Sequence, residues 1–161
     1  RSVFGFFNPS VEYQYSQKLV YIMPNVGGKF YMCQVAKCGE KWHVLDLVMR
    51  ETVSLEEMKS VICSHDAGTY IVESSPAYFQ MARELRNTLP EVRIKKEYQD
   101  MDKRIAATSD FIKSYFLLSE TGMENDEYMA FITEVLDYND ENISGASALL
   151  SGMAYHIIKL G

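Results

Sequence analysis

Cysteine is scarce in this chain, and the other features that define several common protein classes are also missing. The three cysteines, Cys33, Cys38 and Cys63, are odd in number and lack a C-x-x-C spacing, which argues against a disulfide framework and against a zinc site. No run of eighteen apolar residues is present, so we predict no membrane span. No basic-then-apolar signal segment opens the chain, and we expect reduced thiols in the cytoplasm.

A surplus of basic residues is also missing. The formal net charge is −6, whereas a strong stand-alone nucleic-acid binder relies on cations that neutralise phosphates. The pair Gly28-Lys29 is not part of a phosphate-binding loop, because Met23 stands where the motif needs its first glycine and Phe30 stands where it needs Ser or Thr. We therefore interpret residues 24–28 as a turn.

What the chain does contain suits one α/β domain. Its 161 residues, 47% of them hydrophobic and 24% charged, are enough for a single domain with a substantial core. The chain begins at Arg1 without a Met, as expected of a fragment or a trimmed chain. We expect residues 1–17 to form a lead-in segment, packed on the domain or linked to something upstream, and residues 18–161 to form the domain.

Three strand-like runs open the domain, at residues 18–23, 30–36 and 42–48. Their short, glycine-containing links are typical of hairpins, so we predict an antiparallel meander. Ser54 and Glu57 form a capping box that begins a helix. The β-branched and aromatic run at 69–73 predicts a buried strand of a parallel sheet. Ser75 and Pro76 then favour a helix, to about residue 89.

The second half adds one strand and several helices. We predict a strand at residues 92–98, a helix from residue 102, a brief extended piece at 115–118, and helices at 124–138 and 144–160. This is the element order of a ribonuclease H-like fold: three strands in a meander, followed by helix, strand, helix, strand and further helices. We therefore predict an α/β fold with a mixed five-stranded sheet, a meander plus parallel strands, flanked by helices. This order alone does not define a function.

Glu73 is the leading candidate for a site residue. It ends the predicted buried strand, and a helix follows at once. In open α/β sheets, ligands bind at the carboxyl ends of the strands, in the crevice where helices depart. An exposed loop acid is the alternative.

Several motifs resemble the nuclease domain of phage terminase large subunits. They are YIMPN at 21–25, LVMRE at 47–51, DKRI at 102–105, EYMAF at 127–131, LDY at 136–138 and SALLSGMA at 147–154. Each motif is moderately specific, and their order and spacing carry the resemblance over nearly the whole chain from Lys18 onward. The resemblance implies cleavage of viral double-stranded DNA during genome packaging in the host cytoplasm. The implied partners are an upstream ATPase motor and the portal of the packaging machine.

The resemblance also implies a site for two Mg²⁺ or Mn²⁺ ions. Such ions lie about 4 Å apart and are bound by carboxylates. The family takes one acid from the first strand, one from the end of the fourth strand and others from the opening of the last helix. Glu73 matches the fourth-strand acid, as a catalytic and metal-binding residue. Met23 stands at the first-strand position, and Ser144, Gly145 and Ala148 stand where the last helix would carry acids.

Other side chains are candidates to complete the site. Asp137 and Asp140, with Glu141 and Asn142 beside them, lie just upstream of the last helix and are candidate metal ligands, although a solvated acidic turn is the commoner arrangement. His156 lies eight residues after Ala148 on the last helix, where a packed histidine is the commoner role. A single carboxylate holds two ions poorly, because it does not offset the loss of their bound water.

A group of basic residues on the predicted fifth strand and at the start of the next helix is a candidate DNA-binding surface that would hold phosphates without reading bases. Its members are Arg93, Lys95, Lys96, Lys103 and Arg104. Glu97, Asp100 and Asp102 neutralise it in part, and a mixed solvated edge is the alternative.

Three functions stay open at this point. The chain is an active terminase nuclease domain, a terminase-like domain that has lost its metal site and positions DNA or docks the motor, or an unrelated α/β interaction domain. The missing acids favour weak or absent catalysis. Metal-dependent DNA cleavage separates the first function from the other two.

Overall fold

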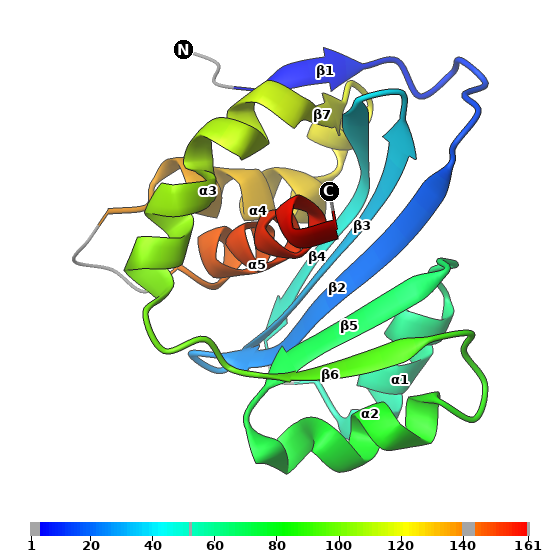
Figure 1. The fold of residues 1–161 in the computed structure, drawn as a ribbon, viewed down its shortest axis with the longest axis vertical. Coiled ribbons are helices and arrows are strands. Elements are labelled where there is room, and N and C mark those ends of the chain that lie inside the picture. The colour runs from blue at the N-terminus through cyan, green and yellow to red at the C-terminus, as the bar shows by residue number, and fades with distance from the viewer. Residues whose placement is uncertain (1–3, 52, 140–143, 161) are drawn as a thin grey trace.

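A mixed sheet forms the centre of the computed structural model, which describes residues 4–51, 53–139 and 144–160 (Figure 1). The strand order within these residues is β1-β7-β4-β3-β2-β5-β6. The strands are β1 (Gly5–Phe7), β2 (Gln17–Val26), β3 (Lys29–Cys38), β4 (Lys41–Glu51), β5 (Thr69–Ser74), β6 (Val92–Lys96) and β7 (Phe116–Ser119). β2, β3 and β4 form the antiparallel meander, while β5 pairs in parallel with β2, and β6 with β5.

This arrangement confirms the ribonuclease H-like fold, including the fourth predicted strand beside the first. The expected number of five strands was wrong, because the described sheet has seven. β7 occupies the predicted extended piece and pairs with β4, and β1 pairs with β7 inside the segment expected as a lead-in. β1, with three residues, is too short for a hydrophobic period, so only its pairing with β7 defines it.

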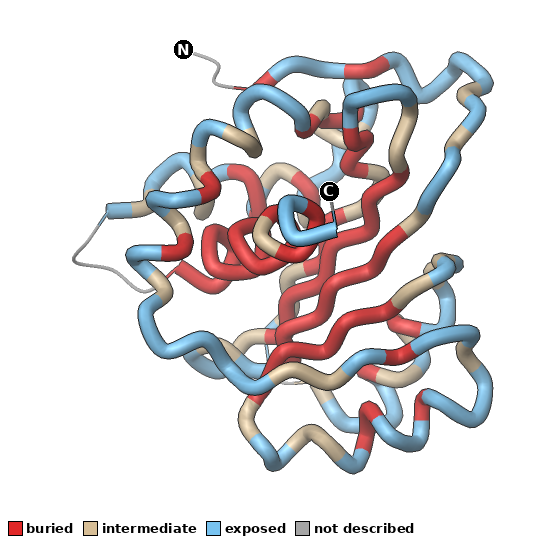
Figure 2. Tube along the Cα trace, in the orientation of Figure 1, coloured by how far each residue is buried: buried red, intermediate tan, exposed pale blue. Residues whose placement is uncertain are grey.

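Helices cover both faces of the sheet (Figure 1). α1 (Leu55–Cys63) and α2 (Phe79–Leu85) pack on one face, and α3 (Met101–Tyr115), α4 (Asp126–Leu136) and α5 (Gly145–Leu160) pack on the other. The side chains of β2 alternate between the two cores, with Val20 and Ile22 facing α1 and α2 and with Tyr21 and Met23 facing α5. Both faces of the sheet are therefore buried under helices, and Figure 2 shows the middle strands buried along most of their length.

Two helices have informative ends. Ser54 caps α1, with its Oγ accepting from the Glu57 N–H at 3.1 Å, as the capping box predicts. The helix predicted at residues 76–89 is shorter, since a 3₁₀ turn η1 (Pro76–Tyr78) precedes α2 and the main-chain N–H groups of residues 86–88 bond to the carbonyl three residues earlier. In the described part of the chain, none of the helices has the length and apolar character needed to cross a membrane.

The small residues of α5 let it approach two tyrosines of the sheet. A Cβ added at Gly152 would lie 2.6 Å from the Tyr21 hydroxyl oxygen, and one added at Gly145 would lie 2.1 Å from a ring carbon of Tyr31. A side chain at either position would force the tyrosine or the helix to shift, so glycine is favoured at both. This close approach brings the middle of α5 to the carboxyl end of β5, where Glu73 lies.

Candidate functional site

Glu73 lies near the end of β5 and is 1% exposed. Its carboxylate accepts three hydrogen bonds: from Arg104 Nη1 at 2.8 Å, from the Tyr98 main-chain N–H at 3.1 Å, and from the Tyr21 hydroxyl. The partners come from α3, from the segment after β6 and from β2. Both carboxylate oxygens are therefore engaged by donors from the protein itself.

Arg104 connects Glu73 to α5. It lies in the first turn of α3, whose start is fixed by Asp100, the N-cap that accepts from the Lys103 N–H at 3.2 Å. Besides Glu73, its guanidinium donates from Nε to Ser151 Oγ at 2.9 Å and from Nη2 to the Ala148 carbonyl at 3.0 Å. The positive charge thus lies between Glu73 and Ala148, the position where the resemblance expected a last-helix acid.

The Glu73–Arg104 pair is sealed from solvent. Arg104 is 2% exposed, and the ring of Tyr98 lies over its guanidinium, with the centroid 4.9 Å from Cζ. A buried ion pair is tolerable only when its polar atoms are bonded and its charges are matched, and both conditions hold. Burial, followed by the nearby Glu73 carboxylate, raises the pKa of Tyr21, so the Tyr21 hydroxyl stays protonated and keeps donating.

The residues around Glu73 do not fit a two-metal centre. Hard divalent ions need several oxygen ligands, but Met23 is packed in the core and Ala148 offers only a carbonyl that Arg104 already uses. Across the described ranges, no group of three or more His, Cys, Asp or Glu side chains is placed to hold a metal ion. A divalent cation there would also meet the fixed charge of Arg104, which repels it.

Of the acids predicted to complete the site, the structure describes Asp137, and this residue is not among the hydrogen-bond partners of Glu73. Asp137 is exposed at the C-terminal end of α4, where its N–H donates to the Thr133 carbonyl at 3.0 Å. Asp140, Glu141 and Asn142 lie outside the described residues.

A different acid, Glu134 of α4, occupies the opening of α5. It accepts from the Ala146 N–H at 2.9 Å and from the Tyr31 hydroxyl at 2.9 Å. The positive end of a helix dipole favours such a carboxylate. Glu134 was missed from the sequence, although its place three residues after the buried Phe131 puts both on one face of α4.

The predicted DNA-binding residues divide into an exposed set and a buried one. Arg93, Lys96 and Lys103 are exposed, and Arg93 Nε lies 2.7 Å from Glu91. Lys95 is half-buried, with Nζ 5.9 Å from the ring centroid of Tyr21, and burial lowers its pKa. Arg104 does not belong to this surface, which corrects the prediction, because its charge is held inside by Glu73.

The burial of the Arg104 side chain could have been inferred from the helical spacing of its neighbours. Arg104 and Thr108 are buried, and Phe111 and Ile112 are half-buried on the same core. A spacing of four and then three or four residues places these side chains on one helical face. His156 is also buried, and burial, followed by the charges of Lys95 and Arg93, lowers its pKa, as expected of a packed neutral histidine.

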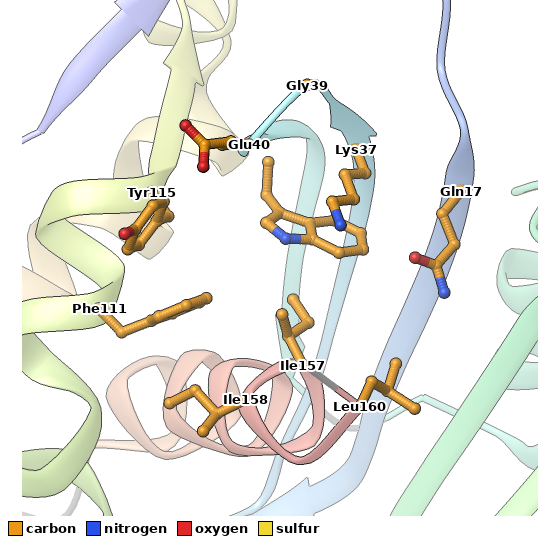
Figure 3. Close-up of a pocket in the computed structure, with 10 residues that line it drawn as sticks. Gln17, Lys37, Gly39, Glu40, Phe111, Tyr115, Ile157, Ile158 and Leu160 are labelled. Atoms are coloured by element: carbon orange, nitrogen blue, oxygen red, sulfur yellow. The ribbon is translucent and has the colours of Figure 1, made fainter.

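A separate surface groove lies between the C-terminal ends of α3 and α5 and the β3–β4 hairpin (Figure 3). Its volume is about 700 Å³, and it is lined by the apolar or aromatic side chains of Trp42, Phe111, Tyr115, Ile157 and Leu160 together with the polar side chains of Gln17, Lys37 and Glu40. Glu73 does not line this groove, so the groove and the candidate site are different places.

Comparisons with known proteins agree with this architecture. No protein-family model matches the sequence, and no curated protein matches it significantly. Among solved structures, the human cytomegalovirus terminase nuclease domain, soaked with manganese, matches with a TM-score of 0.61 and 14% identity over 92% of this chain and 90% of that one. The large terminase of a thermophilic bacteriophage matches with a TM-score of 0.65 and 14% identity, over 94% of this chain and 42% of that one.

A variant nuclease domain of the large terminase subunit of the bacterial virus Sf6, solved with manganese, has a TM-score of 0.59 and 8% identity over 87% of this chain and 88% of that one. At such identities the likeness shows the fold alone. The class is a ribonuclease H-like α/β domain. Within that class, the chain has the fold of terminase nuclease domains.

Proposed function

We propose that this chain is a terminase-type nuclease domain in which an internal ion pair has replaced the metal centre. It would act on double-stranded DNA during packaging by positioning the duplex, without cutting it. The observation that carries the proposal is the guanidinium of Arg104, which lies between Glu73 and Ala148 and bonds to both.

The chemistry of this pair argues against hydrolysis. Arginine stays protonated and has no acceptor atom, so it neither takes a proton from water nor coordinates a metal. Before Glu73 could bind a metal, its bonds to Arg104, Tyr21 and Tyr98 would have to break, leaving Arg104 as an unpaired buried cation. Breaking a buried pair costs about 3–5 kcal/mol, which opposes metal binding at this position.

Contact with DNA is supported by the basic residues beside the pair. Arg93, Lys95, Lys96 and Lys103 lie on β6 and on the first turn of α3. Cations without a matching base-reading element bind the phosphate backbone irrespective of sequence. Because the whole chain carries a net charge of −6, we expect the affinity for duplex DNA to be weak and to fall steeply with salt.

The first test is nicking of supercoiled plasmid in Mg²⁺ or Mn²⁺, with Glu73→Ala as the control, beside duplex binding measured by fluorescence anisotropy. We expect no nicking by the folded wild-type protein, and duplex binding that weakens in Lys96→Ala/Lys103→Ala. Nicking by the wild type that disappears in a Glu73→Ala protein shown to be folded would overturn the proposal and favour an active nuclease that uses Asp137 or Asp140.

The groove of Figure 3 favours docking of an ATPase motor as a second candidate function. Its rim exposes Tyr115, Ile158 and Leu160, and exposed apolar patches mark protein interaction sites. Substituting Ile158→Asp would then abolish association with the motor in a pull-down with purified motor domain, whereas Lys96→Ala/Lys103→Ala would not. Equal association of both variants would rule this candidate out.

A further inference from the structure

Aromatic rings and cations alternate on the surface above the Glu73–Arg104 pair. The ring of Tyr98 covers Arg104, and its centroid lies 6.0 Å from that of Tyr155 on α5. Lys159 Nζ lies 5.1 Å from the ring centroid of Tyr155. We call Lys95, Tyr98, Tyr155 and Lys159 the Tyr98–Tyr155 surface.

The rings of this surface are accessible. Tyr98 is 36% exposed and Tyr155 is half-buried. The buried guanidinium of Arg104 lies over one face of the Tyr98 ring. An exposed aromatic face supported from below by a cation is a suitable platform for a flat, electron-rich ring system.

The lysines of this surface lack a matching anion. In the described part of the chain, neither Lys95 nor Lys159 forms an ion pair. The carboxylate below them, Glu73, is already neutralised by Arg104.

Glu97, beside Tyr98, is exposed and forms no ion pair with either lysine in the described residues, and three other acids are engaged elsewhere. Glu91 pairs with Arg93, Asp100 caps α3, and Asp102 accepts from the Tyr138 hydroxyl. The surface therefore offers two cations beside two rings and leaves an anion to be supplied from outside.

We propose that the Tyr98–Tyr155 surface binds unpaired nucleotides, with one base stacked on Tyr98, the next on Tyr155, and their phosphates held by Lys95 and Lys159. Single-strand binders combine the same two elements, aromatic platforms and a positive track. A paired base presents only its edge, so a duplex would reach the lysines and not the ring faces. This inference rests on the proposed function, since it adds a preference for frayed or single-stranded DNA to a domain that positions DNA.

The test compares the binding of a labelled dT12 strand and a 12-base-pair duplex by fluorescence anisotropy at low salt. We expect tighter binding of dT12. We expect Tyr155→Ala to weaken dT12 binding about tenfold and to leave duplex binding unchanged, because stacking contributes only to the single strand. Lys159→Ala should weaken both and reduce the single-strand salt slope by about 0.7, the value for one lost phosphate contact.

Two further variants serve as controls, one for the tyrosine hydroxyl and one for the position of the ring. Tyr98→Phe keeps the ring over Arg104 and should bind dT12 like the wild type. Tyr115 lies in the separate groove and is 37% exposed, close to the 36% of Tyr98. Tyr115→Ala should therefore change neither the affinity for dT12 nor the affinity for the duplex. Equal affinity for the two DNAs, or an unchanged dT12 affinity in Tyr155→Ala, overturns this inference while duplex binding still supports the proposed function. Loss of both kinds of binding in the wild-type protein overturns both.

Discussion

Two carboxylates face α5 in matching surroundings, yet they are neutralised in different ways. Glu73 bonds to Tyr21 of β2, and Gly152 packs on that tyrosine ring. Glu134 likewise bonds to a tyrosine of the neighbouring strand, Tyr31 of β3, on whose ring Gly145 packs. Each site therefore has one glutamate, one tyrosine and one glycine of α5.

The difference between the two sites follows from burial. The side chain of Glu73 is 0% exposed and is matched by the full charge of Arg104. The side chain of Glu134 is 22% exposed; it is matched by the N-terminal end of α5, and Lys29 Nζ lies 3.7 Å away. A carboxylate that retains some water can rely on a helix terminus, whereas a fully buried one needs a bonded cation. The comparison explains why the candidate site contains an arginine at all.

The largest expected effect comes from removing that cation. Arg104→Met should lower the free energy of unfolding by about 3–5 kcal/mol, because it leaves Glu73 charged and unpaired in the core. Urea unfolding at pH 7 measures the change. Lys95→Met is the matched control, and it should cost under about 1 kcal/mol, since Lys95 is half-buried and has no ion pair in the described residues.

A double variant sharpens this prediction. Glu73→Gln/Arg104→Met removes both charges and should be more stable than Arg104→Met alone, as the coupling of a buried pair requires. If the stability loss of Glu73→Gln/Arg104→Met instead equals the sum of the losses of Glu73→Gln and Arg104→Met, the pair is not the source of the stability.

The next effect concerns the glycine of α5 at each site. Gly152→Ala should destabilise by about 1–3 kcal/mol, because its Cβ would meet the Tyr21 hydroxyl oxygen inside a closed core. The cost should fall in a Tyr21→Leu background, since the hydroxyl oxygen at 2.6 Å and the ring carbons Cζ and Cε1 at 2.7 and 2.8 Å are then all gone. Thermal unfolding of the four proteins in this cycle measures it, and an unchanged cost in the Leu background would refute the steric explanation.

Much of this architecture could be predicted from the sequence, and the parts that could not share a cause. The meander, the strand ending in Glu73 and the capped α1 all rest on local signals: alternation, an apolar run and a Ser–Glu spacing. β1 could not be predicted, because three residues become a strand only by pairing with β7.

The candidate site was also predicted only in part, because the sequence carries local signals but not long-range contacts. Glu73 stands out locally as an acid at the end of a buried strand. Arg104 was instead expected on the surface, because a basic residue near others suggests DNA contact, whereas its partners Glu73, Ala148 and Ser151 are distant in sequence. The only sign of such a tertiary contact in the sequence is helical periodicity, which places Arg104 and Thr108 on one face of α3.

Alkaline pH provides a smaller test that addresses both sites together. Burial, followed by the adjacent glutamate, raises the pKa of Tyr21 and of Tyr31. The folded state then keeps both protons while the unfolded chain releases them near pH 10, so stability that is complete below pH 10 is lost as pH rises above it.

Each such tyrosine contributes a loss of up to about 1.4 kcal/mol per pH unit above its unfolded pKa. Urea unfolding between pH 9 and 11 measures the loss. Tyr21→Phe and Tyr31→Phe should each flatten the pH dependence, and a profile unchanged in both variants would contradict the assignment.

The smallest expected effect is at Glu134 and tests the comparison most directly. Glu134→Gln keeps an acceptor for the Ala146 N–H and for the Tyr31 hydroxyl but removes the charge at the start of α5. A charge at a helix terminus contributes about 0.3–1 kcal/mol and is screened by salt, so the loss should be of that size and should shrink in 1 M salt. The same change at Glu73 should cost several times more and should not respond to salt, because it leaves Arg104 buried without a counter-charge. Similar costs at the two positions would mean that burial does not set how these carboxylates are neutralised.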